Sequence, residues 1–401
     1  MTPEHAYADL IRRVRDAGVL ASCAGLLGWD ERTYMPRAGT AHRGEQMALL
    51  ARLGHEMVTD PKIGELLADI EGTPLVADPA SDAAANAREI RRTYDRATKL
   101  PKELVEELAR VTTQAQGVWQ EARQTNNFTL FLPWLEKVVA LKRQEAAAVG
   151  YRDHPYDALL DEYEPGATTA EIRRVFADLT ADLVPLVERI AGSGRQPDHD
   201  LLHREFPVDR QEAFARSAAS AIGFNFDAGR LDTTTHPFCS GLGPGDCRIT
   251  TRYNPRFFNE AFFGVLHETG HAIYEQNLPK EHFGTPLGSA CSLGIHESQS
   301  RLWENQVGRG RPFWEHFYPR LKQTFPAALA DVPLDAFYFA INDVRPSLIR
   351  VEADEATYNL HIALRFALEL ALLSGDLTTG DLPGAWNERF EALFGLKVPD
   401  D

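Results

Sequence analysis

The segment 254–278, NPRFFNEAFFGVLHETGHAIYEQNL, constrains this chain more than any other part of its sequence. Asn254 can cap a helix, Pro255 suits a first helical turn, and Leu278-Pro279 favours a helix end. Apolar side chains occur on nearly every side of the predicted helix, at Phe257, Phe258, Phe262, Phe263, Val265, Leu266, Ile273 and Tyr274. A helix that is apolar all round is typical of a protein core. We therefore expect a buried helix whose ionisable side chains must find partners.

That helix carries the pentapeptide HETGH. His267 and His271 are four residues apart, so they lie on one face of the helix, about 6 Å apart along its axis. Two imidazoles at this spacing can bind one tetrahedral Zn²⁺, and Glu268 can accept a proton from a water molecule beside it. The alternative, a chance string, leaves several polar side chains unpaired in an aromatic helix, which is costly. The pattern predicts a zinc site with Glu268 as the general base.

A catalytic zinc site needs a third protein ligand and one open position. The residues that follow His271 lack the glycine and histidine of the HExxHxxGxxH pattern, which excludes that class of site. Glu297, in the sequence GIHESQS, follows after a helix end and a turn, so a second helix can return it to the histidines. The weaker candidates are Glu275, Glu281 and Glu304. The first shares the helix of both histidines, and the second follows a proline in a predicted loop. We predict Glu297 as the third ligand.

Most of the remaining sequence predicts long helices. Thr168 and Glu171 have the spacing of a capping box, and apolar residues then recur at steps of three and four. Helices are also expected from Pro3 onward and at about 82–99, 102–124, 130–148, 211–222, 313–323 and 354–374. No linker rich in Gly, Ser or Pro divides the chain. We therefore expect one mainly α domain that spans residues 1–401.

Strand signal is concentrated between residues 231 and 253. Residues 231–235 and 248–253 are rich in Thr and β-branched side chains, and they flank the turn-forming run 241–245, GLGPG. The pattern predicts a small β-hairpin inserted into the helical domain.

Charge and composition limit the classes of binding partner that we expect. The chain has 42 Lys and Arg against 58 Asp and Glu, a formal net charge of −16. Such an acidic surface repels nucleic-acid phosphates and anionic membranes, so neither is expected as a partner. The four cysteines form no CxxC pair, which argues against a disulfide scaffold or a thiolate zinc site. The first twenty residues contain no apolar signal core, so the expected location is the cytoplasm.

Several motifs occur together with HETGH. They are HESQ at 296–299, HPF at 236–238, DCRIT at 246–250 and IRVEAD at 349–354. With these motifs in the family's order along the sequence, the chain resembles the carboxypeptidase Taq family of zinc carboxypeptidases, which is related to proteins of the thimet-oligopeptidase fold. The resemblance covers essentially all 401 residues. It implies a large helical metallopeptidase domain with a deep cleft, a catalytic core at 231–360, bound Zn²⁺ with Co²⁺ as an alternative, and a homodimer.

The resemblance also implies roles for individual residues. His267, His271 and Glu297 would be the metal ligands, Glu268 the general base, and Arg350 the receptor of the substrate's C-terminal carboxylate. An Arg suits this task because its planar fork of donors matches a carboxylate. The alternative for Arg350 is a structural salt bridge, for which the nearby acids are Glu352, Asp354 and Glu355.

Further residues have less defined roles. His236 and Arg248 either shape the substrate pocket or tie the hairpin to the catalytic helix. His296, Gln299 and Asp354 are expected to orient the side chains that bind metal or substrate.

The sequence thus predicts a metallocarboxypeptidase that removes single C-terminal residues from peptides with broad specificity. Two alternatives stay open: an oligoendopeptidase with the same zinc site, and a truncated zinc-binding homologue of low activity. Members of the family carry a GxxQDxHW motif after the point that corresponds to Asp401, so we expect this chain to lack the family's C-terminal segment.

Overall fold

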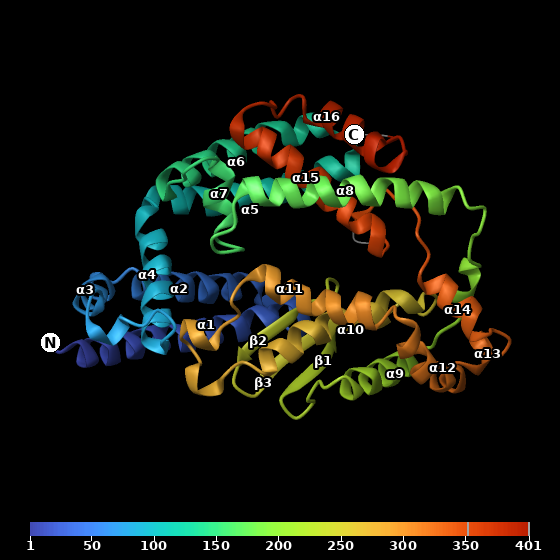
Figure 1. The fold of residues 1–401 in the computed structure, drawn as a ribbon, viewed down its shortest axis with the longest axis horizontal. Helices are drawn as coiled ribbons and strands as arrows, with labels where there is room; N and C mark the ends of the chain where they lie inside the picture. The colour runs from blue at the N-terminus through green and yellow to red at the C-terminus, as the bar shows by residue number, and fades with distance from the viewer. Residues whose placement is uncertain (351–352, 400–401) are drawn as a thin grey trace. The chain divides into compact units, whose positions relative to one another are not determined.

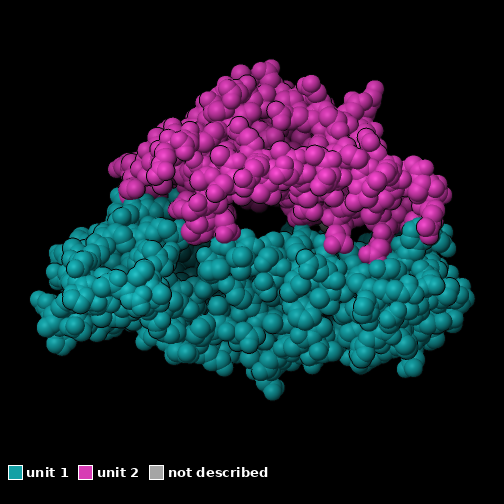
Figure 2. Space-filling view, in the orientation of Figure 1, with its two compact units in different colours: residues 1–98, 198–341 teal, residues 99–197, 342–401 magenta. Residues whose placement is uncertain are grey.

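The computed structural model describes residues 1–350 and 353–399. The chain divides into two compact units, coloured separately in Figure 2: unit 1 is residues 1–98 and 198–341, and unit 2 is residues 99–197 and 342–401. Both are built mainly from helices, so the predicted mainly α class is confirmed (Figure 1). The predicted catalytic core, 231–360, contributes residues to both units, and its place in a single domain stays a prediction.

Unit 1 combines helices with a small sheet. Its helices are α1 (Pro3–Thr33), α2 (Thr40–Val58), α3 (Pro61–Ile70), α4 (Asp82–Lys99), α9 (Val208–Ala221), α10 (Phe258–Gln276), α11 (Leu293–Arg301), α12 (Arg311–Thr324), α13 (Pro326–Leu329) and α14 (Leu334–Ile341). Its strands are β1 (Gly229–Thr233), β2 (Cys239–Gly243) and β3 (Asp246–Thr251). A π-helical turn, Leu302–Val307, directly continues α11.

All the regular secondary structure among the described residues of unit 2 is helical. Its helices are α5 (Lys102–Thr125), α6 (Phe128–Val149), α7 (Pro155–Leu160), α8 (Thr169–Ala191), α15 (Glu355–Ser374) and α16 (Leu382–Phe394). Within the part of the chain that the structure describes, no helix combines the length and apolarity needed to cross a bilayer.

One of two capping signals in the sequence, that of α8, is reproduced in the structure. The Thr168 side chain accepts a hydrogen bond from the Glu171 amide, and the Glu171 side chain closes the capping box of α8. The start predicted for α10 is wrong. The side chain of Asn254 accepts from the amide of Arg256 in a turn, and the helix begins only at Phe258. The side-chain oxygen of Asn254 is occupied by this turn, so α10 begins without a side-chain cap.

The sheet differs from the predicted hairpin. Its strand order is β1-β3-β2, and β1 pairs with β3 in parallel, with Leu231 opposite Ile249. The antiparallel partner of β3 is β2, which includes part of the glycine run expected to be the turn, and in this pairing Ser240 lies opposite Arg248. The third strand, β2, forms because Gly241 and Gly243 pair with β3 instead of forming the turn. The turn lies just after them, at residues 244–245.

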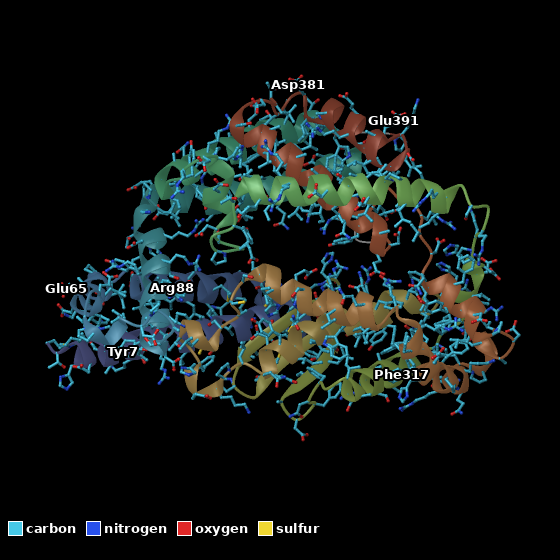
Figure 3. The ribbon with its side chains drawn as sticks, in the orientation of Figure 1. Tyr7, Glu65, Arg88, Phe317, Asp381 and Glu391 are labelled. Atoms are coloured by element: carbon cyan, nitrogen blue, oxygen red, sulfur yellow. The ribbon has the colours of Figure 1, made fainter. Side chains whose placement is uncertain are left out.

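The core of unit 1 forms around α10, which packs against β3, α9 and α11. Phe258 and Phe262 stack at 5.0 Å between ring centroids, and the fully buried Trp314 of α12 meets both rings. Phe317, labelled in Figure 3, extends this cluster toward α9 through Phe214. The predicted burial of the HETGH helix is therefore confirmed, and its position is fixed by aromatic packing.

The core of unit 2 contains a histidine. His361 on α15 is fully buried, and its ring lies 5.7 Å from that of Phe390 and 4.4 Å from that of Phe394, both on α16. Burial, followed by the charge of Arg365, lowers the pKa of His361 to about 4. A folded chain therefore holds this imidazole neutral at a pH where an unfolded chain protonates it.

This shift predicts acid sensitivity. The stability that neutral His361 contributes is present above its usual pKa of 6.5 and is lost as the pH falls from there toward 4. The free energy of unfolding, measured in urea, should fall between pH 7 and pH 5 in both proteins. The fall should be about 2 kcal/mol smaller in His361→Leu than in the parent. Replacing the exposed His42 by Leu should leave the parent's pH dependence intact. An equal pH dependence in parent and His361→Leu would contradict the prediction.

Candidate metal centre

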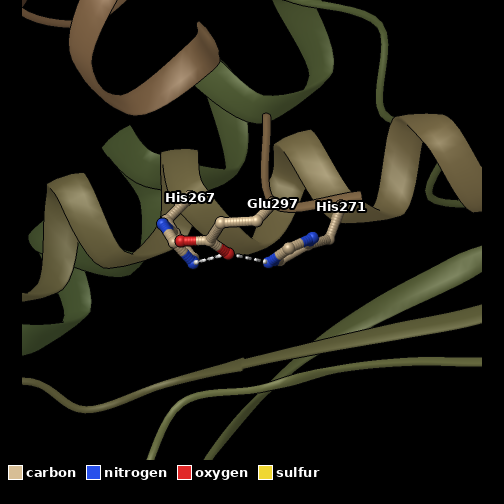
Figure 4. A group of neighbouring side chains, drawn as sticks. All are labelled: His267, His271 and Glu297. Carbon is tan, nitrogen blue, oxygen red and sulfur yellow. Dashed lines mark ion pairs between the residues drawn. The ribbon is translucent and has the colours of Figure 1, made fainter. Parts of the chain in front are cut away.

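Helices α10 and α11 bring His267, His271 and Glu297 together, and Figure 4 shows the carboxylate between the two imidazoles. One oxygen, Oε2 of Glu297, lies 3.6 Å from Nε2 of His267 and 3.3 Å from Nε2 of His271. One ligand atom from each residue lies within 4.8 Å of the others. Three side chains thus direct their donor atoms to one point.

This spacing fits a small tetrahedral cation. Metal–ligand bonds of about 2.0–2.1 Å place tetrahedral ligand atoms roughly 3.4 Å apart. The observed 3.3 Å and 3.6 Å agree with that value. Burial raises the pKa of Glu297, but the hydrogen bond to His271 and the nearby His267 and Arg301 outweigh it and lower this pKa to about 2. The carboxylate is therefore ionised, as a metal ligand must be.

A single glycine allows the two helices to approach this closely. A Cβ on Gly270 would lie 2.4 Å from the carbonyl oxygen of Gln299 and 2.6 Å from Cα of Ser300. Ser300 also donates from Oγ to the backbone carbonyl of Glu297, at 2.6 Å. The backbone of α11 therefore rests directly on α10, one residue before His271.

Glu304 engages the second ring nitrogen of His267. Its Oε2 lies 2.8 Å from Nδ1 of His267 and 2.9 Å from Nη1 of Arg301. The π-helical turn brings Glu304 to this position. Burial opposes ionisation of Glu304, but these two partners lower its pKa overall. With Nδ1 of His267 bonded to a carboxylate, its Nε2 is left with a free lone pair for a metal.

His271 has a different partner. Its Nδ1 lies 2.5 Å from Nδ1 of His296 on α11, and Nε2 of His296 lies 2.7 Å from Oε1 of Glu275 on α10. The sequence predicts that His296 orients a metal-binding side chain, and the structure places it in contact with His271, one of the predicted ligands. Both imidazoles therefore keep Nε2 directed toward Glu297.

Glu268 follows His267 directly and is 6% exposed. Its carboxylate has no hydrogen-bond partner among the described residues. Burial raises the pKa of Glu268 to about 7 in the metal-free chain, so its carboxyl group is poised to exchange protons near neutral pH. A buried carboxyl group of this kind beside a metal site can activate water.

Three other predicted residues of unit 1 lie on the sheet, in a connection between its strands, or on α11. His236 is exposed in the connection between β1 and β2. Arg248 forms two hydrogen bonds of 2.8 Å with Asp246, and its guanidinium lies 4.3 Å from the ring centroid of Trp29 on α1. These contacts connect β3 to α1 and not to the catalytic helix α10, so both roles considered for Arg248 stay predictions. The side chain of Gln299 donates to Ser298, and no hydrogen bond from it to a ligand occurs among the described residues.

Arg350 and Asp354 belong to unit 2. Arg350 donates to the Tyr358 hydroxyl at 2.6 Å, and no carboxylate of the described residues forms an ion pair with it. This disfavours the salt-bridge alternative with Asp354 or Glu355, while Glu352 lies outside the described residues. Asp354 caps α15 by accepting from the amides of Ala356 and Thr357, which makes it a helix-capping residue.

The contacts of Glu275 and Glu304 were not predicted from the sequence, in which both residues were considered only as third ligands. A signal existed for Glu304, because seven residues separate it from Glu297 and place both on one face of a helix. No comparable signal existed for Glu275, since its partner His296 belongs to another helix.

Comparison with known proteins gives one consistent family. Residues 9–401 match the family described as Carboxypeptidase Taq (M32) metallopeptidase. Thermostable carboxypeptidase 1 of Thermus thermophilus is 52% identical, over 100% of this chain and 80% of its own length. Carboxypeptidase 1 of Bacillus subtilis is 37% identical, over 100% of this chain and 79% of its own length.

Solved structures agree with these sequence relatives. The M32 carboxypeptidase from Deinococcus radiodurans R1 superimposes with a TM-score of 0.95 at 39% identity, and the match covers 99% of this chain and 79% of that chain. Both the family and the helical architecture are therefore shared with carboxypeptidases.

The contact at Gly270 predicts an unusual response to alanine. Gly→Ala inside a helix normally stabilises by about 1 kcal/mol. In Gly270→Ala the added methyl group contacts the backbone of α11. We therefore expect the free energy of unfolding to fall by about 1–3 kcal/mol and metal binding to weaken. The matched control is Gly264→Ala on the same helix, whose Cβ would lie an ordinary 3.6 Å from Thr251. Urea unfolding and zinc titration of both variants test this, and equal behaviour would refute it.

Proposed function

The chain belongs to the carboxypeptidase Taq (M32) metallopeptidase family and is a metallocarboxypeptidase, and we propose that it uses Zn²⁺ held by His267, His271 and Glu297. The observation that carries this assignment is the convergence of the three donor atoms, with spacings of 3.3 Å and 3.6 Å. Two imidazoles and one carboxylate form a donor set typical of catalytic zinc, with a fourth position left for water or substrate. Co²⁺, which accepts the same ligands, is the alternative ion.

The reaction is hydrolysis of the last peptide bond of a peptide. A bound Zn²⁺ would polarise the scissile carbonyl and make a water molecule acidic enough to attack it near neutral pH. Glu268 accepts the proton of the attacking water and then donates it to the nitrogen of the leaving amino acid. Its burial supports this role, because a carboxylate shielded from bulk water exchanges protons with the reacting groups.

Arg350 supplies selectivity for the C-terminus in this proposal. Its guanidinium has no carboxylate partner among the described residues and is held by the Tyr358 hydroxyl. A cation of this kind can bind the free carboxylate of a substrate through two parallel hydrogen bonds. Fixing the terminal carboxylate in this way limits cleavage to one residue at a time.

Other expectations stay predictions from the sequence. They are broad side-chain specificity, substrate contacts by His236, a homodimer and a cytoplasmic location. Arg248 is engaged by Asp246 and Trp29, so we propose that it supports the sheet beside α10.

Glu268→Gln tests the general base. The amide is nearly isosteric but cannot accept a proton from water, so kcat should fall by about 10²–10⁴-fold while zinc content is unchanged. The matched control is Glu260→Gln on the same helix, where only an ion pair with Arg252 is lost. Hydrolysis of an N-blocked dipeptide and metal analysis give both readouts. Unchanged turnover in Glu268→Gln would exclude this residue as the base.

Arg350→Ala tests selectivity for a free C-terminus. We expect kcat/KM on a peptide with a free carboxylate to fall by about 10²-fold or more, since a desolvated charge pair is lost. Arg350→Lys should also be impaired, because it keeps the charge but loses the two-pronged geometry.

The comparison substrate is the same peptide with a C-terminal amide, and the control variant is Arg389→Ala, which replaces an exposed arginine of α16. The amide substrate should be affected little by Arg350→Ala. Equal losses on both substrates would identify Arg350 as a structural residue.

A further inference from the structure

The two ligand histidines are supported in different ways. His267 contacts the carboxylate of Glu304 directly, whereas His271 reaches the carboxylate of Glu275 only through the ring of His296. We propose that Glu275 and His296 are positioning residues that act in series on His271 and fix the tautomer in which it binds the metal. This inference rests on the proposed function, in which His271 is a metal ligand.

The distances determine where the protons lie. Two Nδ1 atoms 2.5 Å apart share one proton, so one ring donates and the other accepts. A neutral His271 that binds metal through Nε2 carries its proton on Nδ1 and therefore donates to His296. His296 then accepts at Nδ1 and carries its own proton on Nε2. That proton is donated to the carboxylate oxygen Oε1 of Glu275.

The sheet holds Glu275 in place. A Cβ on Gly241 of β2 would lie 2.3 Å from Oε2 of Glu275, so the backbone of β2 lies against this carboxylate. Its other oxygen, Oε1, accepts from His296. The side chains of Glu275 and His296 are 23% and 17% exposed, which limits competition from water. The carboxylate is therefore confined between the sheet and His296.

The arrangement spans both helices that hold the ligands. His271 and Glu275 are one turn apart on α10, and His296 lies on α11, one residue before Glu297. The series of hydrogen bonds runs from His271 on α10 to His296 on α11 and back to Glu275 on α10. It therefore couples the orientation of His271 to the position of Glu297, the proposed carboxylate ligand. Removing either member should loosen the metal site without unfolding the aromatic core, which lies elsewhere on α10.

The experiment measures Zn²⁺ affinity by chelator competition. His296→Phe removes the acceptor for His271 and should weaken Zn²⁺ binding by about 10–100-fold. His296→Asn keeps an acceptor near the position of Nδ1 and should recover part of that loss. Glu275→Ala should weaken binding in the same direction. The matched control is the exposed Glu281→Gln, which should leave the affinity unchanged.

A double-mutant cycle tests whether the two residues act in series. If Glu275 acts only through His296, adding Glu275→Ala to His296→Phe should cause no further loss of Zn²⁺ affinity. Glu304→Gln, which acts on His267, should add its full loss to that of His296→Phe. Additive losses for Glu275 and His296, or no effect of Glu275→Ala alone, would overturn the proposal.

Two more measurements separate this proposal from its premise. The visible spectrum of the Co²⁺-loaded chain reports ligand geometry, and it should change in His296→Phe while the thermal midpoint of the metal-free chain does not. An unchanged spectrum in His296→Phe would overturn the positioning role. Glu297→Ala should abolish tight Zn²⁺ binding if the ligand set is correct. Unaltered Zn²⁺ binding in Glu297→Ala would instead overturn the ligand assignment, which is a separate failure.

Discussion

The backbone contact between α10 and α11 at Gly270 is the constraint on which the candidate metal centre depends. Because no side chain separates the helices there, Glu297 of α11 reaches both histidines of α10. The same approach places His296 against His271. A larger residue at position 270 would displace Glu297 and His296 together.

Close packing also explains how this unit accommodates its ionisable side chains. Burying charged groups is costly unless each is paired. Here His267 pairs with Glu304, and Glu297 with Arg301, so most of the cost is offset by hydrogen bonds. Glu268 differs, because burial raises its pKa to about 7 and no hydrogen bond among the described residues compensates. The residue proposed as the base is thus the one without a compensating hydrogen bond among the described residues. Shifted pKa values of this kind are typical of reactive groups.

Helices were predicted far better than the sheet, for a physical reason. A helix such as α8 is specified by its own cap, Thr168 with Glu171, and by a local apolar repeat. Strand pairing depends on residues distant in sequence, and β1 lies parallel to β3, which no local turn signal encodes. The cysteines illustrate the same limit. Cys239 and Cys247 are free thiols with sulfur atoms 3.6 Å apart, a proximity that only the ladder between β2 and β3 creates.

The sequence by itself determined the helical class, the buried HETGH helix and the shared face of His267 and His271, because spacing along a helix fixes which side chains share a face. Glu297 was predicted by weighing the downstream glutamates, and the packing of α11 on α10 places it beside both histidines. Only the tertiary structure decided which side chains contact these three residues. Glu275 is presented to His296 by a different helix and is confined by a strand, and neither contact has a signature in local sequence. Periodicity encodes faces within one element, whereas the partners of a buried imidazole are chosen by packing between elements.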